Sequence, residues 1–391
     1  MRGSFHRLRH DERGVSLVFV SVAFMALLSA TTLAIDVGMF MTARSQAQNA
    51  ADAGALAGAT ALTFNSFTNR SATGPAVQSA VNTALRNTVQ GAAVSVTPDD
   101  VTFPLDPSGQ ADRVAVQVHR TTERGNAVPT LMGGFFGLRT ADVGATATAE
   151  ATPANAFTCV KPFTIPDRWI ENRNPPWTST TSTFDRYYPN GNQRGQLMSP
   201  ADAYPVAGTP TYQGYSMNNP SDIGMLLTIR AGTGNNVSPS MYFSWAMPSN
   251  TGADDYEGNI ANCNPTVVTR GAIITQEPGE MSGPTSQGID ALIARDPNAY
   301  WDLTCNCVRG SAFPTSPRVF PIPLYDPDYY QSNVTNGRNA TLRVANWIGF
   351  FLITRTGQDI QGRITPILGI VDPNAGPAPD GSFARAIRLV Q

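Results

Sequence analysis

The stretch VSLVFVSVAFMALLSATTLAI, residues 15–35, contains 21 residues with no charge and no proline. As an α-helix it would be about 31 Å long, which spans the roughly 30 Å hydrocarbon core of a bilayer. The stretch therefore predicts a transmembrane helix, to which we assign residues 15–41. Residues 1–14 then form a short tail in front of the membrane.

Basic residues are distributed unequally on the two sides of this stretch. The next basic residue after it is Arg44. Four arginines precede it: Arg2, Arg7, Arg9 and Arg13. Because flanks rich in Lys and Arg stay in the cytoplasm, we expect a cytoplasmic tail and a chain that otherwise lies outside. The alternative is a cleaved signal peptide ending near Ala34, although the apolar region of a signal peptide is usually only about 7–15 residues long.

The overall composition excludes several classes of protein. The 391 residues carry a net charge of −2, and only 14% of them are charged, so no basic surface for nucleic acid is indicated. The single lysine, Lys161, lies between Val160 and Pro162 and not in a GK[ST] motif, which excludes a P-loop hydrolase. The 34 glycines and 30 prolines indicate many turns and irregular connections.

After the apolar stretch the chain becomes rich in alanine. Residues 42–62 read TARSQAQNAADAGALAGATAL and contain no proline, which predicts that the helix continues beyond the membrane. Small residues recur at a spacing that allows close helix packing: Ala47, Ala51, Gly54 and Gly58. They either pack on the chain's own domain or meet a partner helix.

The order of these features resembles a known family. Glu12-Arg13-Gly14, the apolar stretch, Asp36-Val37-Gly38 and the sequence QNAADAGALA at 48–57 together resemble the N-terminal module of TadE/TadG-like proteins of Tad (Flp, tight-adherence) pilus assembly. The similarity is close over residues 12–62 and looser through residue 150. It implies a single-pass protein of the bacterial inner membrane whose bulk is periplasmic or extracellular, with pilus-assembly proteins or minor pilins as partners.

Two features of that family group are not matched. Cleavage after Gly14 would place Phe19 at the fifth mature position, where type IV-like prepilins have Glu. Asp380-Gly381-Ser382 is followed by Phe383 and is not the DxSxS metal motif of members with a von Willebrand-type domain. We therefore assign no metal site and no cofactor.

The hydrophobic patterns predict an α+β fold. Residues 42–152 are expected to form the Ala-rich helix and a small α+β domain, with a helix at 75–89, short strands at 94–96 and 101–103, and alternating strands at 113–120 and 143–149. Residues 153–391 are expected to form a β-rich exported domain. Its strand candidates are 225–229, 241–246, 267–275, 318–323, 341–354 and 363–370, and a helix is expected at 287–295. The tracts 173–190 and 208–220 are either ordered surface loops or flexible spacers.

All four cysteines lie in this second segment: Cys159, Cys263, Cys305 and Cys307. An even number in an exported segment favours two disulfides over free thiols. Cys305 and Cys307 are expected to be too close to bridge each other, so each is predicted to pair with Cys159 or Cys263. A zinc site is the less favoured alternative, because C-x-C spacing without a nearby histidine is not typical of one.

Candidates for catalysis are few. His119 is the only histidine outside the N-terminal tail, and its pattern predicts a solvated position on a strand. The carboxylates Asp254, Asp255 and Glu257, and the pair Asp326 and Asp328, would suit half of a glycosidase site or a calcium loop, but their surroundings favour polar turns. We assign no catalytic residue.

Aromatic residues crowd the proline-rich loops: Trp169, Trp177, Tyr187, Tyr188, Tyr325, Tyr329 and Tyr330. They either bind a carbohydrate or partner protein or pack beneath the loops. The sequence as a whole predicts a membrane-anchored structural component of Tad pilus assembly that is not an enzyme. The alternatives are a secreted or surface-displayed adhesin and, less favoured, an exported hydrolase.

Overall fold

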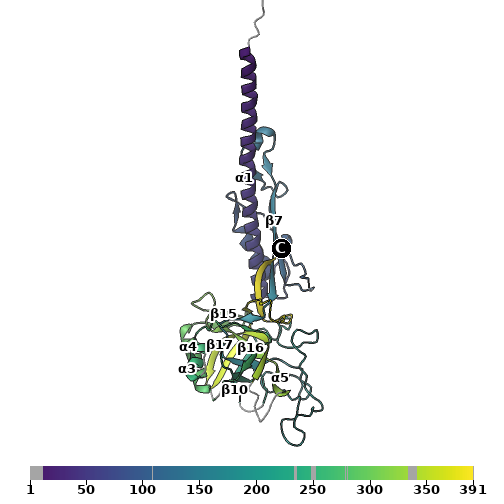
Figure 1. The fold of residues 1–391 in the computed structure, drawn as a ribbon, viewed down its shortest axis with the longest axis vertical. Coiled ribbons are helices and arrows are strands. Elements are labelled where there is room, and N and C mark those ends of the chain that lie inside the picture. The colour runs from purple at the N-terminus through teal and green to yellow at the C-terminus, as the bar shows by residue number, and fades with distance from the viewer. Residues whose placement is uncertain are drawn as a thin grey trace, which may run out of the picture.

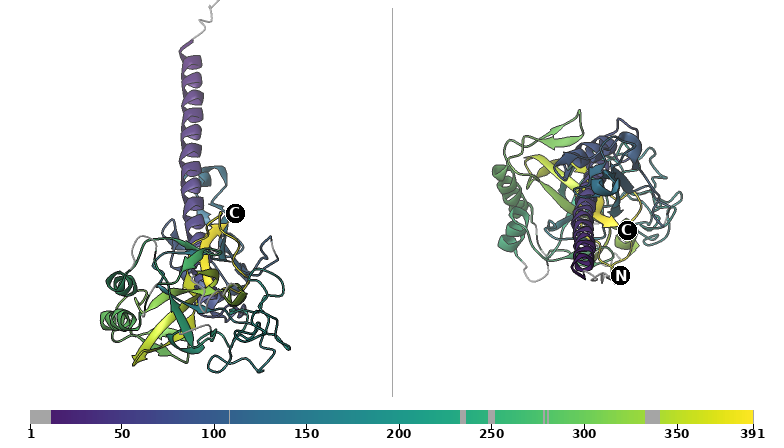
Figure 2. Two further views of the ribbon diagram at one scale, coloured as in Figure 1. Left: turned by 60° about the horizontal axis from the view of Figure 1, so that its bottom comes forward. Right: turned by 90° about the horizontal axis from the view of Figure 1, so that it is seen from above.

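A computed structural model describes residues 12–107, 109–232, 236–247, 252–277, 279, 281–332 and 341–390. The basic residues of the tail up to residue 11 lie outside this description. Helix α1, Glu12–Phe64, runs unbroken for 53 residues, so the apolar stretch and the Ala-rich stretch form one helix as predicted. Its N-terminal part stands clear of a globular body (Figures 1 and 2). This part is long and apolar enough to cross a membrane, and none of its apolar window is buried.

The C-terminal half of α1 packs on a five-stranded sheet with the order β19-β20-β7-β4-β3. The strands are β3 (Val101–Thr102), β4 (Arg113–Arg120), β7 (Val143–Pro153), β19 (Ile367–Leu368) and β20 (Ala384–Val390). Helix α2, Pro75–Leu85, packs against α1. We call α1 from Asp36 onward, α2 and this sheet the proximal module.

Strand β20 brings the end of the chain back to the proximal module. It pairs antiparallel with β7, from Arg385 opposite Pro153 to Val390 opposite Thr148. The chain therefore ends beside α1 (Figure 1). The sequence had not predicted this strand, and its position means that the chain leaves the proximal module after β7 and returns to it at the C-terminus.

Short elements complete the proximal module. Strands β1 (Thr88–Val89) and β2 (Ala92–Ala93) form a hairpin, so the helix predicted at 75–89 ends earlier, at Leu85. The 3₁₀ turn η1, Pro98–Asp100, precedes β3. A second hairpin consists of β5 (Val128–Pro129) and β6 (Thr140–Ala141), with the 3₁₀ turn η2, Gly133–Phe136, between them.

The globular body is built on a closed barrel. Strands pair in the order β17-β16-β9-β11-β10-β18, and β18 pairs again with β17, so the sheet closes on itself. Closure leaves no free edge among these six strands. They are β9 (Phe163–Pro166), β10 (Leu226–Ala231), β11 (Met241–Ser244), β16 (Val319–Tyr325), β17 (Thr341–Thr356) and β18 (Asp359–Thr365). One hydrophobic cluster extends from the Ala face of α1 into the barrel interior.

Smaller elements surround the barrel. Helices α3 (Ala253–Ala261) and α4 (Ser282–Arg295) pack on each other, and α5 (Pro327–Ser332) follows β16. Strand β13 (Ile273–Thr275) extends the barrel sheet beside β17. Two further two-stranded pairs are β8 (Ala156–Phe157) with β12 (Val268–Thr269), and β14 (Tyr300–Asp302) with β15 (Cys307–Arg309).

The predicted α+β class, with a β-rich second part, is confirmed. The alternation of Val114, Val116 and Val118 is the buried face of β4, as expected. The single strand expected at 267–275 is wrong, because a turn at Arg270 and Gly271, with Gly271 at φ 85°, divides it into β12 and β13. The polar turn expected at 254–257 is also wrong, because these residues form the first turns of α3.

Candidate functional site

The small residues of α1 lie against the rest of the proximal module. Ala47 and Ala51 are buried there. A Cβ added to Gly54 would lie 3.1 Å from the Ala80 carbonyl oxygen and 3.1 Å from Ala84 Cβ, both on α2. The small side chains thus allow α2 and the sheet to approach the α1 backbone closely within one chain.

Gly58 is the tightest of these contacts. A Cβ at this position would lie 2.7 Å from Cγ1 of Val114 on β4 and 3.2 Å from Cβ of Ala80 on α2. Real Cβ atoms do not approach other atoms this closely, so only glycine fits where α1 passes between α2 and the sheet.

Asp36 is the first charged residue after the apolar stretch, and it is buried. Its carboxylate accepts hydrogen bonds from the backbone N–H groups of Leu131, at 2.9 Å, and Met132, at 3.2 Å. Both donors belong to the hairpin of β5 and β6. The contact therefore fastens this hairpin to α1 at the point where the apolar stretch ends.

The cysteines form two disulfides, as predicted, but the predicted pairing is wrong. Cys159 is bonded to Cys263, 104 positions away, and Cys305 is bonded to Cys307. The Cα atoms of Cys305 and Cys307 are 5.2 Å apart, because Asn306 between them adopts a left-handed backbone with φ 48°. This Cα–Cα distance is within the normal range for a disulfide, so two cysteines separated by one residue can bridge each other here.

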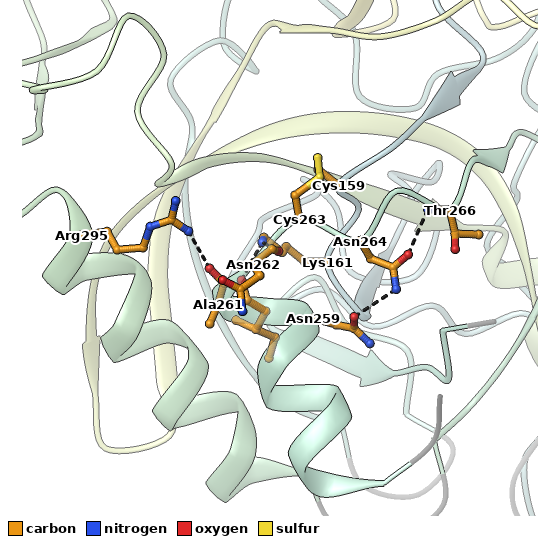
Figure 3. Close-up of a disulfide and its surroundings, with 10 residues drawn as sticks. Cys159, Lys161, Asn259, Ala261, Asn262, Cys263, Asn264, Thr266 and Arg295 are labelled. Carbon is orange, nitrogen blue, oxygen red and sulfur yellow. Dashed lines mark hydrogen bonds between the residues drawn. A yellow bond between two sulfur atoms is a disulfide. The ribbon is translucent and has the colours of Figure 1, made fainter. Parts of the chain in front are cut away.

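The Cys159–Cys263 bond fastens the segment before β9 to the end of α3 (Figure 3). The buried Lys161 follows two residues later, and its Nζ donates hydrogen bonds to the carbonyls of Ile260, at 2.6 Å, and Asn262, at 2.7 Å. Burial lowers the pKa of Lys161 to about 7, and the charge of Arg295 acts in the same direction. The lysine thus satisfies carbonyl groups at the C-terminal end of α3 that have no partner within the helix.

A cleft of about 880 Å³ opens between the proximal module and the barrel loops. Four segments that are distant in sequence line it: Gln110, residues 168–177, residues 208–219 and residues 377–380. Two of the aromatic residues that the sequence singled out line this cleft: Trp169 is buried, and Trp177 is partly exposed. The guanidinium carbon of Arg168 lies 4.7 Å from the centre of the Trp177 ring, a cation–π arrangement.

Two buried carboxylates fix the shape of this cleft. Asp222 accepts hydrogen bonds from Arg168 Nη1 at 2.6 Å and from the Ser216 backbone N–H at 3.1 Å. Asp167 accepts hydrogen bonds from the hydroxyls of Tyr204, at 2.8 Å, and Tyr212, at 2.5 Å. Burial raises the pKa of Asp167 to about 6 despite these bonds. The sequence did not single out either aspartate, because their partners come from remote segments.

The structure places the remaining candidates for catalysis in structural positions. His119 Nε2 lies 3.1 Å from an Asp100 carboxylate oxygen, so its side chain is not simply solvated as expected. Asp254 and Asp255 are exposed in the first turn of α3. Within the described ranges no group of three or more His, Cys, Asp or Glu side chains is arranged to hold a metal ion.

The carboxylates of Asp326 and Asp328 each form an ion pair with an arginine. Asp326 lies 2.5 Å from Arg343 Nη2, and Asp328 lies 2.9 Å from Arg186 Nη1. Asp326 also accepts a hydrogen bond from the Tyr329 backbone N–H at 2.8 Å, at the start of α5. The first ion pair joins the start of α5 to β17 of the barrel, and the second joins α5 to the loop that contains Arg186.

The aromatic residues divide into two groups. Trp169, Tyr325 and Tyr330 are buried in a second hydrophobic cluster beneath the loops, so they are packing residues. Tyr187 and Tyr188 line a small pocket of about 190 Å³ beside α5, and Trp177 lines the large cleft. The interpretation that these aromatic residues pack beneath the loops therefore holds for Trp169, Tyr325 and Tyr330.

Comparisons with known proteins identify one part of the chain. Neither curated proteins nor solved structures gave a match. One family model, Tad, described as Flp pilus-assembly TadE/G-like, matches residues 14–61, which are nearly all of α1. The match supports involvement in Flp pilus assembly, and that family is of a structural, non-enzymatic kind. Residues 14–61, the helix of membrane length with its alanine-rich continuation, thus match the TadE/G-like family of Flp pilus assembly.

Proposed function

We propose that this protein is a membrane-anchored structural component of Tad (Flp) pilus assembly that acts by associating with other proteins. The observation that carries the proposal is the coincidence of the TadE/G-like match at residues 14–61 with a helix whose apolar part is unburied. An isolated, fully exposed apolar helix is costly in water and stable in a bilayer. The helix is therefore assigned to the bacterial inner membrane as a single span.

The same proposal gives the chain an orientation. The arginine-rich tail stays in the cytoplasm, and the proximal module and globular body lie in the periplasm or at the cell surface. The two disulfides suit an oxidising compartment. The partners are other pilus-assembly proteins or minor pilins, which the anchor brings to a high effective concentration beside the body.

Fractionation of the native host with a C-terminal tag tests the anchor. Full-length protein should stay in the membrane pellet after an alkaline carbonate wash, and protease added to spheroplasts should remove the tag. Shortened protein in the periplasm or medium would overturn the anchor. Enrichment in sheared filaments would instead assign the protein to the fibre.

A matched pair of variants separates anchoring from assembly. Replacing residues 15–35 with an unrelated apolar helix of equal length should keep the protein in the membrane. Gly58→Val should also leave the membrane span intact while disturbing the proximal module. If pili form normally with Gly58→Val although the proximal module is unfolded, assembly does not depend on that module.

The cleft supports a second candidate function, that of a surface-displayed binding protein. Its lining combines the ring of Trp177 with the amides of Gln213, Asn218 and Asn219, a mixture suited to the apolar faces and hydroxyls of a carbohydrate. The buried indole N–H of Trp177 has no hydrogen-bond partner within the described ranges. Titration with oligosaccharides should quench tryptophan fluorescence in the native chain and not in Trp177→Phe.

A further inference from the structure

The hairpin of β5 and β6 lies beside α1 at the end of the apolar stretch. Leu131 and Met132 donate their backbone N–H groups to Asp36, which directly follows Ile35. A helix rises about 1.5 Å per residue, so this contact lies within one residue of the end of the apolar stretch along α1 and inside the transmembrane helix assigned to residues 15–41. Figure 1 shows the loop above β7 extending along α1 toward its N-terminal part.

This hairpin has no charge up to its last residues. Residues 128–138 read VPTLMGGFFGL, and Arg139 is the first charged residue after them. The side chains of Leu131 and Leu138 are 61% and 66% exposed. An exposed leucine by itself is ordinary in a soluble protein, but this uncharged hairpin places two exposed leucines beside α1 where its apolar stretch ends.

The exposed apolar surface of α1 continues past Asp36, beyond the residue that the hairpin contacts. Val37 and Met41, four residues apart and so on one face, are 43% and 71% exposed. The first basic residues beyond this surface are Arg44 on α1 and Arg139 on the hairpin, and both are exposed. An apolar surface followed by exposed arginines is the arrangement found where the acyl chains of a membrane meet the lipid headgroups.

We infer that the hairpin of residues 128–141 lies in the interfacial layer of the membrane beside α1, with Leu131 and Leu138 in lipid. The inference rests on the anchor proposed above. Arg44 and Arg139 then lie near the lipid phosphates. The occupant of this surface is lipid, because the exposed apolar face of α1 runs from the span to Met41 and the hairpin is bonded to α1 within that length.

The contact with Asp36 explains how the hairpin stays at this depth. A carboxylate at the membrane boundary is costly unless its oxygen atoms are hydrogen-bonded. The N–H groups of Leu131 and Met132 supply those bonds, and the same bonds fix the hairpin to α1. Two membrane contacts, the span and the hairpin, would hold the globular body in one orientation on the membrane.

Depth-dependent fluorescence quenching tests this inference on the full chain reconstituted in phosphatidylcholine vesicles. All five native tryptophans lie in the body, between residues 169 and 347. Leu131→Trp and Leu138→Trp should each add tryptophan emission. Lipids brominated near the headgroup end of the acyl chain should quench this added emission at least twofold more than lipids brominated near the end of the chain. Leu197→Trp, an equally exposed leucine of the body, is the matched control and should not be quenched by either lipid.

A tryptophan within the span separates the failure of this inference from the failure of the anchor. Phe24→Trp should be quenched most by bromines near the bilayer centre. If Phe24→Trp is quenched and both hairpin variants behave like Leu197→Trp, the hairpin does not contact lipid and the inference is overturned. If Phe24→Trp is not quenched, the anchor itself is wrong and the hairpin contact fails with it.

Asp36 variants test how the hairpin is held. Asp36→Asn keeps an oxygen that accepts a hydrogen bond, so Leu138→Trp should retain its quenching in this background. Asp36→Ala removes both bonds and should reduce the quenching of Leu138→Trp by at least half. Equal quenching in the two backgrounds would show that Asp36 does not position the hairpin.

Discussion

Gly58 on α1 and Val114 on β4 lie so close that a methyl group on the glycine would be 2.7 Å from the valine Cγ1. We therefore expect Gly58→Ala to destabilise the proximal module by about 1–3 kcal/mol, the usual cost of overpacking a core. Thermal unfolding in detergent micelles, followed by circular dichroism, measures this change. Gly38→Ala is the control, because no atom lies within 4 Å of a Cβ at this position on the same helix. Equal melting temperatures for the two variants would contradict the close contact.

The two disulfides should differ in their effect on stability. The Cys159–Cys263 bond closes a loop of 104 residues, whereas the Cys305–Cys307 bond spans two. In the chain-entropy relation the first contributes about 4–5 kcal/mol and the second about 1.2 kcal/mol. We expect Cys159→Ser with Cys263→Ser to lower the melting temperature severalfold more than Cys305→Ser with Cys307→Ser. If the two double variants melt together, loop length is not what decides the stabilisation.

How far the sequence predicted this fold depends on whether the signal was local. The apolar stretch, the Ala-rich helix and the valine alternation of β4 each lie within one element and were predicted correctly. Strand β20 was missed because its arginines interrupt the apolar pattern. Arg385 is nevertheless buried, with its guanidinium carbon 4.3 Å from the Phe67 ring centre and its Nη1 donating to the Ala151 carbonyl.

The cleft and the cysteine pairing were beyond local reasoning for different reasons. The cleft is assembled from four segments between Gln110 and Asp380, and no spacing along the chain indicates that they meet. The Cys305–Cys307 bond depends on the left-handed backbone of Asn306, a conformation that asparagine adopts more readily than most residues. The asparagine between the two cysteines was the available signal.

Lys161 should make stability depend on pH above neutrality. Its pKa is about 7 in the folded protein and about 10.4 in an unfolded chain, so between these values the unfolded chain binds more protons. Stability therefore rises with pH from about 7 to about 10. The neutral amine still has two N–H groups for the carbonyls of Ile260 and Asn262.

Urea unfolding at several pH values between 6 and 10 measures this rise. Lys161→Met keeps an unbranched side chain, one atom shorter, and has no titrating group, so the rise should disappear. The variant is less stable overall because two carbonyls lose their donor. A rise of the same size in Lys161→Met would assign the pH dependence to other groups.

Asp167 should have the opposite dependence in acid. Its pKa is raised to about 6, so the folded protein holds this proton at pH values where the unfolded chain, with a pKa near 3.9, releases it. The resulting stabilisation is complete below about pH 4 and is lost as pH rises to about 6. Two pKa units correspond to about 2–3 kcal/mol.

Asp112 titrates in the same range and has to be separated from Asp167. Burial and the neighbouring carboxylate of Glu150 raise its pKa to about 6. Melting temperatures measured between pH 3.5 and 7 should therefore fall least in the double variant Asp112→Asn with Asp167→Asn, and by intermediate amounts in each single variant. If Asp167→Asn alone leaves the wild-type fall unchanged, the carboxylate between Tyr204 and Tyr212 is already ionised at pH 4, and the cleft is built around a buried anion.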